Sequence, residues 1–390
     1  MKTRIASLSL LALAACGPVE PGTDGGTEPT CSEGFCTHTA PAGAQNNSLL
    51  LTVSGEGAAT EGFGFPPPVA GGEAYFVDGW EITFTRVLVT VGNVTVSENP
   101  DLDPNDASKT GALVAESVGP WALNLAKEGP LDAKEQNGKA WPVTRLTAQN
   151  KKAGSPPFDA TTKYALGYSL LGAKNGVFNV NLDAADQTAY TAMISKGQSV
   201  LLEGTATWKG GVGCRSTVAS YDFTTAPQTV NFSFGFVAPV DFKNCVNPEL
   251  SPAESRGVQT QAGAQTTTQV TFHLDHPFWE SLEEDAPLRW DALAALGKSS
   301  ITEADLAIDF QAFRDTNAMA IPWRTCGPTL DNERTSGTVS YDPVSVPVNP
   351  AGGAAGLKNL ADYMTYNLST FGHMNNDGLC FPQRKYPSPQ

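Results

Sequence analysis

The chain is poor in basic residues and in histidine. Its 390 residues include 25 Lys and Arg against 40 Asp and Glu, and four His. A protein that binds nucleic acid or an anionic lipid surface needs clustered positive charge to neutralise phosphate groups. The net charge of −15 therefore argues against both kinds of partner, and favours solubility and attraction for cations.

Two familiar catalytic motifs are also missing. No Gly-x-Ser-x-Gly segment, which carries the nucleophile of many hydrolases, occurs in the sequence. Gly297-Lys298-Ser299 matches the end of a phosphate-binding loop, but Ala292 stands where that loop needs its first glycine. The sequence thus gives no support for an esterase of this type or for a P-loop nucleotide-binding enzyme.

A run of about 20 apolar residues, which a membrane-spanning helix needs, is missing as well. Residues 1–15 instead combine Lys2 and Arg4 with a shorter apolar stretch and small residues just before Cys16. This pattern is typical of a bacterial lipoprotein signal peptide, and an ordinary secretory signal is the alternative. We expect Cys16 to carry diacylglycerol and palmitate, and the mature chain to be lipid-anchored in the outer membrane or at the cell surface, since residue 17 is not Asp.

Six cysteines remain once Cys16 carries lipid, and an even number in an exported chain predicts disulfides. Local pairing would join Cys31 to Cys36, Cys214 to Cys245 and Cys326 to Cys380. A thiolate metal site formed by Cys31, Cys36 and His38 is the alternative for the first pair, although an oxidising compartment disfavours it.

The composition divides the mature chain into three parts. Residues 16–47 are rich in Pro, Gly and Thr and predict a flexible tether. Residues 48–247 contain many short strand-like runs separated by Gly, Asn and Pro, which predict an antiparallel β-sandwich body. Residues 248–390 predict one strand, at 269–274, followed by a helical C-terminal portion. The expected fold class is therefore mostly β.

Local signals within the body predict three further features. The alternation of apolar and polar residues changes phase near Arg86, which indicates a β-bulge. Gly92-Asn93 has the composition of a type II′ hairpin turn. Asp183, with Asp186 three residues on, predicts the start of a helix that ends at Gly197 and covers an open end of the sandwich.

Helical patterns recur in the C-terminal portion. Hydrophobic spacing predicts short helices at 277–284, 287–296 and 302–313, and a longer one at 357–371 that Gly372 would end.

Two of the four histidines lie together in the segment Thr271-Phe272-His273-Leu274-Asp275-His276-Pro277. Residues three apart in a strand point to opposite faces, so an unbroken strand would separate the two imidazoles. Pro277 suits the first turn of a helix and predicts that the strand stops near Asp275. The chain would then turn, and His273, His276 and the Asp275 carboxylate could converge.

His373, just past the last predicted helix, completes the candidate site. Neutral imidazoles with a carboxylate suit copper or zinc, and the neighbouring Met374 would favour copper because a thioether is a soft ligand. Asp275 would be a ligand or would orient one. In the competing interpretation the three histidines serve packing and hydrogen bonding alone.

Three segments resemble a family of uncharacterised bacterial surface lipoproteins. They are Phe76-Val77-Asp78-Gly79-Trp80, the His273–Phe278 segment, and Gly372-His373 with the later Gly378-Leu379-Cys380. The resemblance spans most of the mature chain and implies a similar histidine pair and terminal Gly-His segment, but names no reaction. Between His273 and Asp275 this chain has Leu274, whereas members of that family often have glycine at this position. A fainter likeness, in strand-then-helix order, is to copper-binding lipoproteins encoded beside di-haem oxidases.

These observations predict a cell-surface lipoprotein that binds one divalent transition metal, copper or zinc, without turnover. One alternative is a metal-dependent hydrolase, for which Glu280 or Glu283 would be the local base. Another is an adhesion or glycan-binding sandwich with structural histidines, in which Trp80, Trp279 and Trp290 could stack on sugars.

Overall fold

A computed structural model describes residues 30–67, 74–76, 78–135, 138–209, 227–252, 255–279, 288–294, 296–307 and 359–386. The structural statements below concern these residues. The predicted leader, Cys16, Cys214, Cys326, and the glutamates Glu280 and Glu283 lie outside them. Among the described residues, no helix has both the length and the apolar character needed to cross a membrane.

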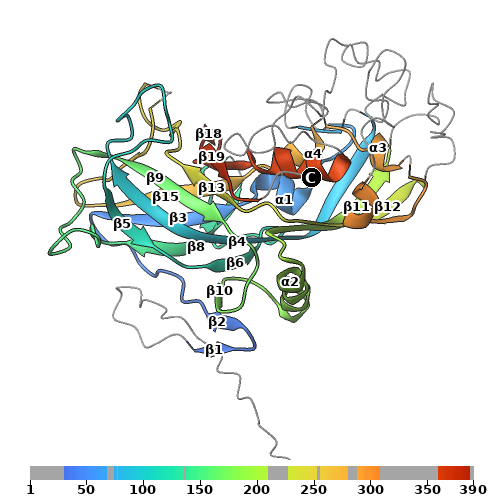
Figure 1. Cartoon of the computed structure of the whole chain (residues 1–390), viewed down its shortest axis with the longest axis horizontal. Helices are drawn as coiled ribbons and strands as arrows, with labels where there is room; N and C mark the ends of the chain where they lie inside the picture. The colour runs from blue at the N-terminus through green and yellow to red at the C-terminus, as the bar shows by residue number, and fades with distance from the viewer. Residues whose placement is uncertain are drawn as a thin grey trace, which may run out of the picture.

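β-strands are the predominant regular structure of the described chain, and they form two sheets (Figure 1). The larger sheet has the order β1 (Cys31–Ser32), β2 (Phe35–Thr37), β10 (Val177–Asn179), β6 (Trp121–Asn124), β4 (Trp80–Glu98), β11 (Val200–Trp208), β12 (Thr229–Phe236) and β16 (Ser300–Thr302). Strands β5 (Leu113–Ser117), β9 (Lys163–Leu170), β13 (Val240–Lys243), β14 (Val258–Gln259) and β19 (Phe381–Arg384) branch from this path. The smaller sheet has the order β18 (Gly378–Leu379), β17 (Gly372–Met374), β15 (Gln265–Phe272), β3 (Ser48–Ser54), β8 (Lys139–Leu146) and β7 (Leu131–Asp132).

The prediction of a mostly β chain is confirmed, but both sheets are mixed. Strand β15 runs parallel to β3, and β10 runs parallel to β2 and β6, while most other pairs are antiparallel. The sequence predicted antiparallel pairing only, whereas the structure also has parallel pairs. Parallel pairs join strands far apart in sequence, which local hydrophobic patterns do not reveal.

The prediction of a flexible tether is wrong for its last part. Strands β1 and β2 form a small hairpin closed by the Cys31–Cys36 disulfide, and β2 pairs with β10. Phe35 and Cys36 are buried there. A few apolar residues suffice to order this segment, because the sheet supplies hydrogen-bond partners for its backbone and the disulfide closes the hairpin loop.

Strand β4 is the longest strand of the larger sheet, and it contains the sites of the predicted bulge and of the predicted hairpin turn. The bulge near Arg86 is confirmed, because the register with β11 shifts between Glu203 and Gly204, which pair with Arg86 and Phe84. The hairpin at Gly92-Asn93 is wrong, because β4 continues through both residues. Asn93 is left-handed, with φ of 48°, and the register with β9 shifts between Gly92 and Thr95, so the turn signal produces a second irregularity within the strand.

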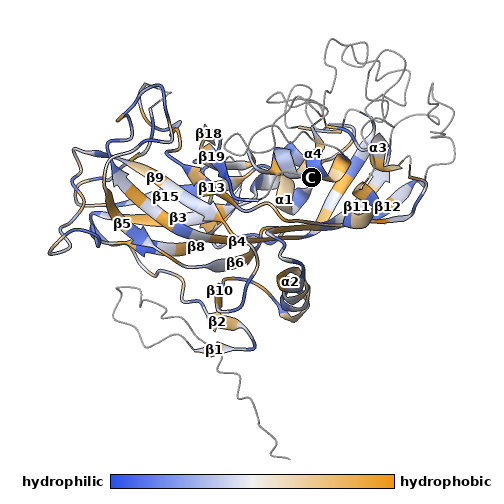
Figure 2. Ribbon diagram, in the orientation of Figure 1, coloured by the Kyte–Doolittle hydropathy of each residue, from blue (hydrophilic) through white to orange (hydrophobic). Residues whose placement is uncertain are grey.

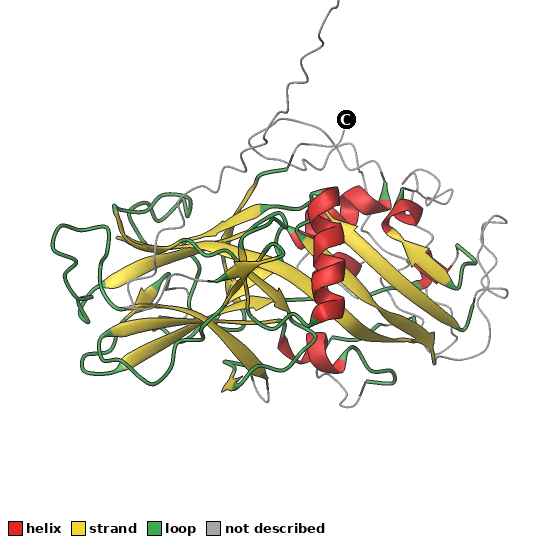
Figure 3. Cartoon of the chain, turned by 90° about the horizontal axis from the view of Figure 1, so that it is seen from below, coloured by secondary structure: helices red, strands yellow, loops and turns green. Residues whose placement is uncertain are grey.

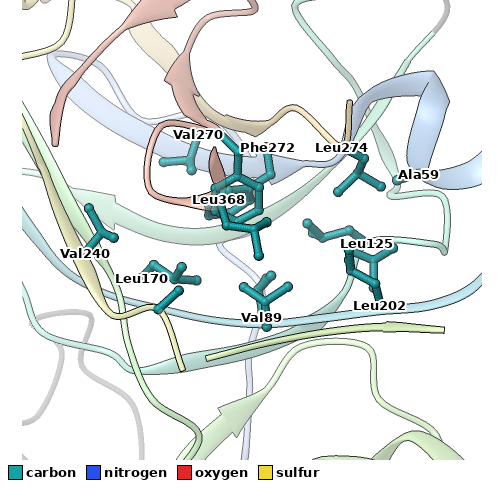
Figure 4. Close-up of a cluster of buried hydrophobic side chains, with 14 of the residues drawn as sticks. Ala59, Val89, Leu125, Leu170, Leu202, Val240, Val270, Phe272, Leu274 and Leu368 are labelled. Atoms are coloured by element: carbon teal, nitrogen blue, oxygen red, sulfur yellow. The ribbon is translucent and has the colours of Figure 1, made fainter. Parts of the chain in front are cut away.

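Both sheets contribute to one hydrophobic core. Val89 and Leu202 of the larger sheet and Val270 and Phe272 of the smaller sheet all belong to it (Figure 4). Figure 2 shows hydrophobic residues interspersed with hydrophilic ones along the strands. This alternation is what a strand with one face in the core requires.

Helix α2 (Ala184–Lys196) begins and ends as predicted. Asp183 and Asp186 form a capping box, and Gly197 adopts the left-handed conformation at the C-terminal cap. Tyr190 and Met193 pack with Leu88 and Leu201 in a second hydrophobic cluster. The helix lies on the opposite side of β4 from α1 (Glu56–Glu61) and α4 (Leu360–Leu368), and is seen in front of the strands in Figure 3. It therefore covers a face of the larger sheet, and not an open end.

The described C-terminal region has less helix than predicted. Within the described parts of these predicted helices, 277–279 comprises the end of the 3₁₀ turn η2 (His276–Phe278) and Trp279, 288–294 contains α3 (Asp291–Ala294), and 302–307 contains the end of β16 and the 3₁₀ turn η3 (Glu303–Leu306). Residues 280–284, 287, 295 and 308–313 of these predictions lie outside the described residues. Helix α4 ends at Ser369, and Gly372 begins β17. Strands β15 and β19 of this region pair with β3 and β13 of the preceding one, so the two share their sheets.

Candidate metal centre

Two of the three predicted histidines are brought together by neighbouring strands of the smaller sheet. On β17, His373 pairs with Thr271 of β15, and His273 follows two residues after Thr271. Side chains two residues apart share a face, so both imidazoles point to the same side of the sheet. Their rings stack, with centroids 3.9 Å apart and an interplanar angle of 28°.

His276 joins this pair through the sharp turn that the sequence predicted, although the turn comes earlier than expected. Strand β15 ends at Phe272, and Asp275 already has a helical backbone conformation. His276 begins η2, with Pro277 in the first turn. The His276 ring centroid lies 5.8 Å from that of His273 and 5.2 Å from that of His373.

The end of α4 fixes the orientation of His276. Thr370 donates its hydroxyl hydrogen to the Asn367 carbonyl oxygen at 2.9 Å, so its Oγ1 accepts from His276 Nδ1, also at 2.9 Å. A neutral imidazole that donates through Nδ1 keeps its lone pair on Nε2. Trp279 stacks on the same ring, with centroids 3.8 Å apart.

Two acceptors face the Nε2 atom of His273. The Asn376 carbonyl oxygen lies 3.0 Å away and Glu56 Oε1 lies 2.9 Å away. Neither oxygen can donate a hydrogen when the carboxylate is ionised, so Nε2 carries a proton. Nδ1 is therefore the nitrogen of His273 that a metal would take.

His373 is buried, with 4 % of its surface exposed, and neither ring nitrogen forms a hydrogen bond of good geometry with another described residue. Its backbone is anchored, because the Tyr168 hydroxyl donates to its carbonyl oxygen at 3.0 Å. A buried imidazole without partners is costly, and such groups call for an explanation. A bound cation would supply the missing partner.

Burial and charge set the protonation of the three rings. Burial, together with the nearby histidines, holds the pKa of His276 and the pKa of His373 well below the usual range. Burial also lowers the pKa of His273, but the Glu56 and Asp275 carboxylates outweigh it and raise that pKa to about 9. His276 and His373 are thus neutral at neutral pH, which is the form that binds metal, whereas His273 is protonated in the metal-free protein and would release a proton when a metal binds.

The three histidines form a group that fits a metal ion. One nitrogen from each lies within 4.8 Å of the other two. Bonds of about 2.0–2.1 Å in a tetrahedral site place ligand nitrogens about 3.3 Å apart. Side-chain shifts on the order of an ångström would bring the three nitrogens to this separation.

Two other predicted contributors take different places. The Asp275 carboxylate is not part of the three-histidine group, and its Oδ2 accepts from Trp279 Nε1 at 3.0 Å. Met374 faces away from His373 along β17 and packs in the hydrophobic core. Met374 therefore gives no reason to prefer copper over zinc. Asp275 is placed to orient Trp279, which stacks on His276.

Cys380 is bonded to Cys245 and not to Cys326, and Cys245 is consequently not bonded to Cys214. The long-range pairing follows from the sheet, because β13 pairs with β19 in the register Lys243 to Phe381. The bond fixes the segment after β17, which carries His373. Only the predicted pairing of Cys31 with Cys36 is confirmed among the described cysteines.

The glycan-binding alternative finds little support in the described residues. Trp80, Trp279 and Trp290 are all buried, with at most 5 % of their surface exposed, so they form no exposed surface for sugars. Glu280 and Glu283, the bases suggested for a hydrolase, lie outside the described part of the chain.

Sequence reasoning missed the residues that hold the histidines. Glu56 comes from α1 and Thr370 from the turn after α4, both distant in sequence from His273. A signal for Glu56 was present, since it is an acidic residue between Gly55 and Gly57, directly after a strand-like run. Thr370 had no such signal.

Comparison with protein-family models, with curated proteins and with solved structures found no match for this chain.

Proposed function

We propose that this protein binds one copper or zinc ion through His273, His276 and His373. The observation that carries the proposal is the arrangement of the ring nitrogens. Hydrogen bonds occupy Nε2 of His273 and Nδ1 of His276, which leaves one nitrogen of each ring for a ligand. Within the described part of the chain, neither ring nitrogen of His373 makes a hydrogen bond of good geometry, although the Thr370 backbone interacts with that ring. Three imidazoles grouped in this way suit zinc or copper.

A binding role without turnover follows from burial. His276 and His373 are almost fully buried, and the side chain of His273 is 13 % exposed. A catalytic metal site must keep a coordination position open to substrate. A site enclosed to this degree favours holding an ion over transforming a substrate.

Metal analysis of the purified protein tests this proposal. After loading with Cu²⁺ or Zn²⁺ and removal of loosely bound ion, the wild type should retain one equivalent. His273→Ala, His276→Ala and His373→Ala should each retain below about a tenth of an equivalent, because two remaining imidazoles bind far more weakly. Far-UV circular dichroism would confirm that each variant is folded.

His38→Ala is the matched control. His38 is the fourth histidine of the chain, is partly buried, and bonds through Nε2 to the Pro142 carbonyl oxygen at 3.1 Å, away from the group. It should retain the full equivalent. Wild-type protein that holds no transition metal, or a metal content that the three group variants leave unchanged, would contradict the proposal.

We further propose that Cys16 is lipidated and that the protein is anchored at the outer membrane or cell surface, as a member of the lipoprotein family that its segments resemble. The support is the sequence of residues 1–16 and the disulfides, which form in oxidising compartments. Labelling with radioactive palmitate should be lost in Cys16→Ser, with the protein released from the membrane fraction. Undiminished labelling of that variant would refute lipidation at this residue.

A further inference from the structure

Glu56 has a backbone conformation that glutamate rarely adopts. It is the first residue of α1, and its φ is 60°, in the left-handed region. Among the described residues, nine non-glycine residues have positive φ, and six of them are Asn, the residue that tolerates this conformation best. The chain thus places Asn at most such positions and Glu at two of them, Glu33 and Glu56, where the backbone is strained.

The turn around Glu56 is also tightly packed. Gly55 precedes it, and a Cβ atom added to Gly55 would lie 2.6 Å from the Ala59 Cβ and 3.0 Å from the Leu125 Cβ. Ala59 belongs to the hydrophobic core. The core therefore fixes where α1 begins, and with it the direction of the Glu56 side chain.

The Glu56 carboxylate is directed at the metal centre. Its Oε1 lies 2.9 Å from His273 Nε2, an ion-pair contact, and makes no hydrogen bond of good geometry with a described residue. The side chain is 21 % exposed. Strained residues persist where the surrounding structure holds them, and such strain is concentrated at functional sites.

We propose that Glu56 is a positioning residue for the metal ligand His273. This inference rests on the proposed function. The carboxylate and the Asn376 carbonyl oxygen both attract the hydrogen on His273 Nε2, which leaves Nδ1 as the nitrogen that can bind a metal. A carboxylate paired with the distal nitrogen of a ligating histidine fixes the ring and makes the other nitrogen a better donor to the metal.

A purely structural role for Glu56 makes the opposite predictions. If the carboxylate served the fold alone, its removal would destabilise the metal-free protein and leave metal affinity unchanged. If it serves His273, Glu56→Asn should relieve backbone strain, because Asn tolerates the left-handed conformation, while weakening metal binding.

The experiment compares wild type, Glu56→Gln, Glu56→Asn and the control Glu61→Gln. Glu61 is exposed and lies at the other end of α1. Dissociation constants for Zn²⁺ and Cu²⁺ would be measured by competition with a chromophoric chelator, the Cu²⁺ site by electron paramagnetic resonance, and the metal-free proteins by thermal unfolding.

We expect both Glu56 variants to bind metal about 10–100-fold more weakly and with an altered Cu²⁺ spectrum, since loss of such a partner has effects of this size. The midpoint of metal-free Glu56→Asn should not fall below that of wild type, and Glu61→Gln should match wild type throughout. Glu56→Gln with wild-type affinity and spectrum would overturn the inference alone. Wild-type protein that binds no metal would overturn the proposed function as well.

Discussion

At the scale of single residues, the candidate site is defined by where each imidazole carries its hydrogen. Thr370 fixes the proton of His276 on Nδ1, and the Asn376 carbonyl oxygen fixes that of His273 on Nε2. His373 has no such partner. Two oriented rings and one ring without a good hydrogen bond are what the proposed binding site would require, whereas three satisfied rings would indicate packing alone.

Thr370→Val tests the role of this orientation. The change keeps the shape of the side chain but removes the hydroxyl that accepts from His276 Nδ1, so we expect about a tenfold or greater loss of metal affinity. Thr365→Val is the control, because the Thr365 hydroxyl bonds to the Ala361 carbonyl oxygen within α4. Equal Zn²⁺ dissociation constants for the two variants would count against the hydrogen-bond argument.

A second residue-scale prediction concerns alkaline pH. Burial raises the pKa of Tyr190 to about 12, whereas an unfolded tyrosine titrates near 10. A raised folded-state pKa gives stability that is complete below the unfolded pKa and is lost as pH rises through the folded one. The wild type should therefore lose stability between pH 10 and 12, by about 2–3 kcal/mol from this residue.

Tyr190→Phe should remove the loss of about 2–3 kcal/mol in the free energy of unfolding that we attribute to this residue between pH 10 and 12. The variant also loses the hydrogen bond between the tyrosine hydroxyl and Thr90 Oγ1, 2.7 Å apart, so at pH 7 it should be less stable by about 1 kcal/mol. Urea unfolding at a series of pH values measures both effects. A variant with the same slope as wild type above pH 10 would show that Tyr190 does not cause the loss.

At the scale of elements, the site depends on contacts between segments remote in sequence. His273 directly follows strand β15, η2 carries His276, and β17 carries His373, while α1 and the turn after α4 supply the orienting groups. Tyr363 of α4 also donates a hydrogen bond to the Trp279 carbonyl oxygen. The start of α1 and the end of α4 therefore act as supports for the three ligands.

The Cys245–Cys380 disulfide is expected to be part of this support. Cys380 follows the hairpin of β17 and β18, and the bond closes a loop of 135 residues. Cys245→Ser/Cys380→Ser should lower the free energy of unfolding by about 2–4 kcal/mol and weaken metal binding, because the segment that carries His373 is released.

Cys31→Ser/Cys36→Ser provides the comparison. That bond closes a loop of five residues in the β1–β2 hairpin, which contacts β10 and not the metal centre. Its removal should leave the metal dissociation constant unchanged. If both double variants bound metal as the wild type does, the Cys245–Cys380 bond would have no role in the site.

At the scale of the whole molecule, local signals predicted local structure. The caps of α2, the bulge near Arg86 and the turn before His276 were all visible in the sequence, because each depends on residues a few positions apart. Gly92-Asn93 was misread as a hairpin, since pairing of β4 with β5 and β9 outweighs the preference of two residues for a turn.

Features that depend on distant segments could not be predicted in this way. The parallel pairing of β3 with β15, the bond between Cys245 and Cys380, and the approach of Glu56 to His273 join parts of the chain separated by more than a hundred residues. The histidine pair was predicted to meet His373 from chemistry alone, and the smaller sheet supplies the physical reason, because β15 and β17 are neighbours.

The most direct test of the central claim is anomalous X-ray scattering from crystals of the zinc- or copper-loaded protein, measured on both sides of the absorption edge of the metal. We expect one anomalous peak about 2.0–2.1 Å from a nitrogen of each of His273, His276 and His373. Loaded crystals with no peak between these three rings, or with the metal bound elsewhere, would contradict it.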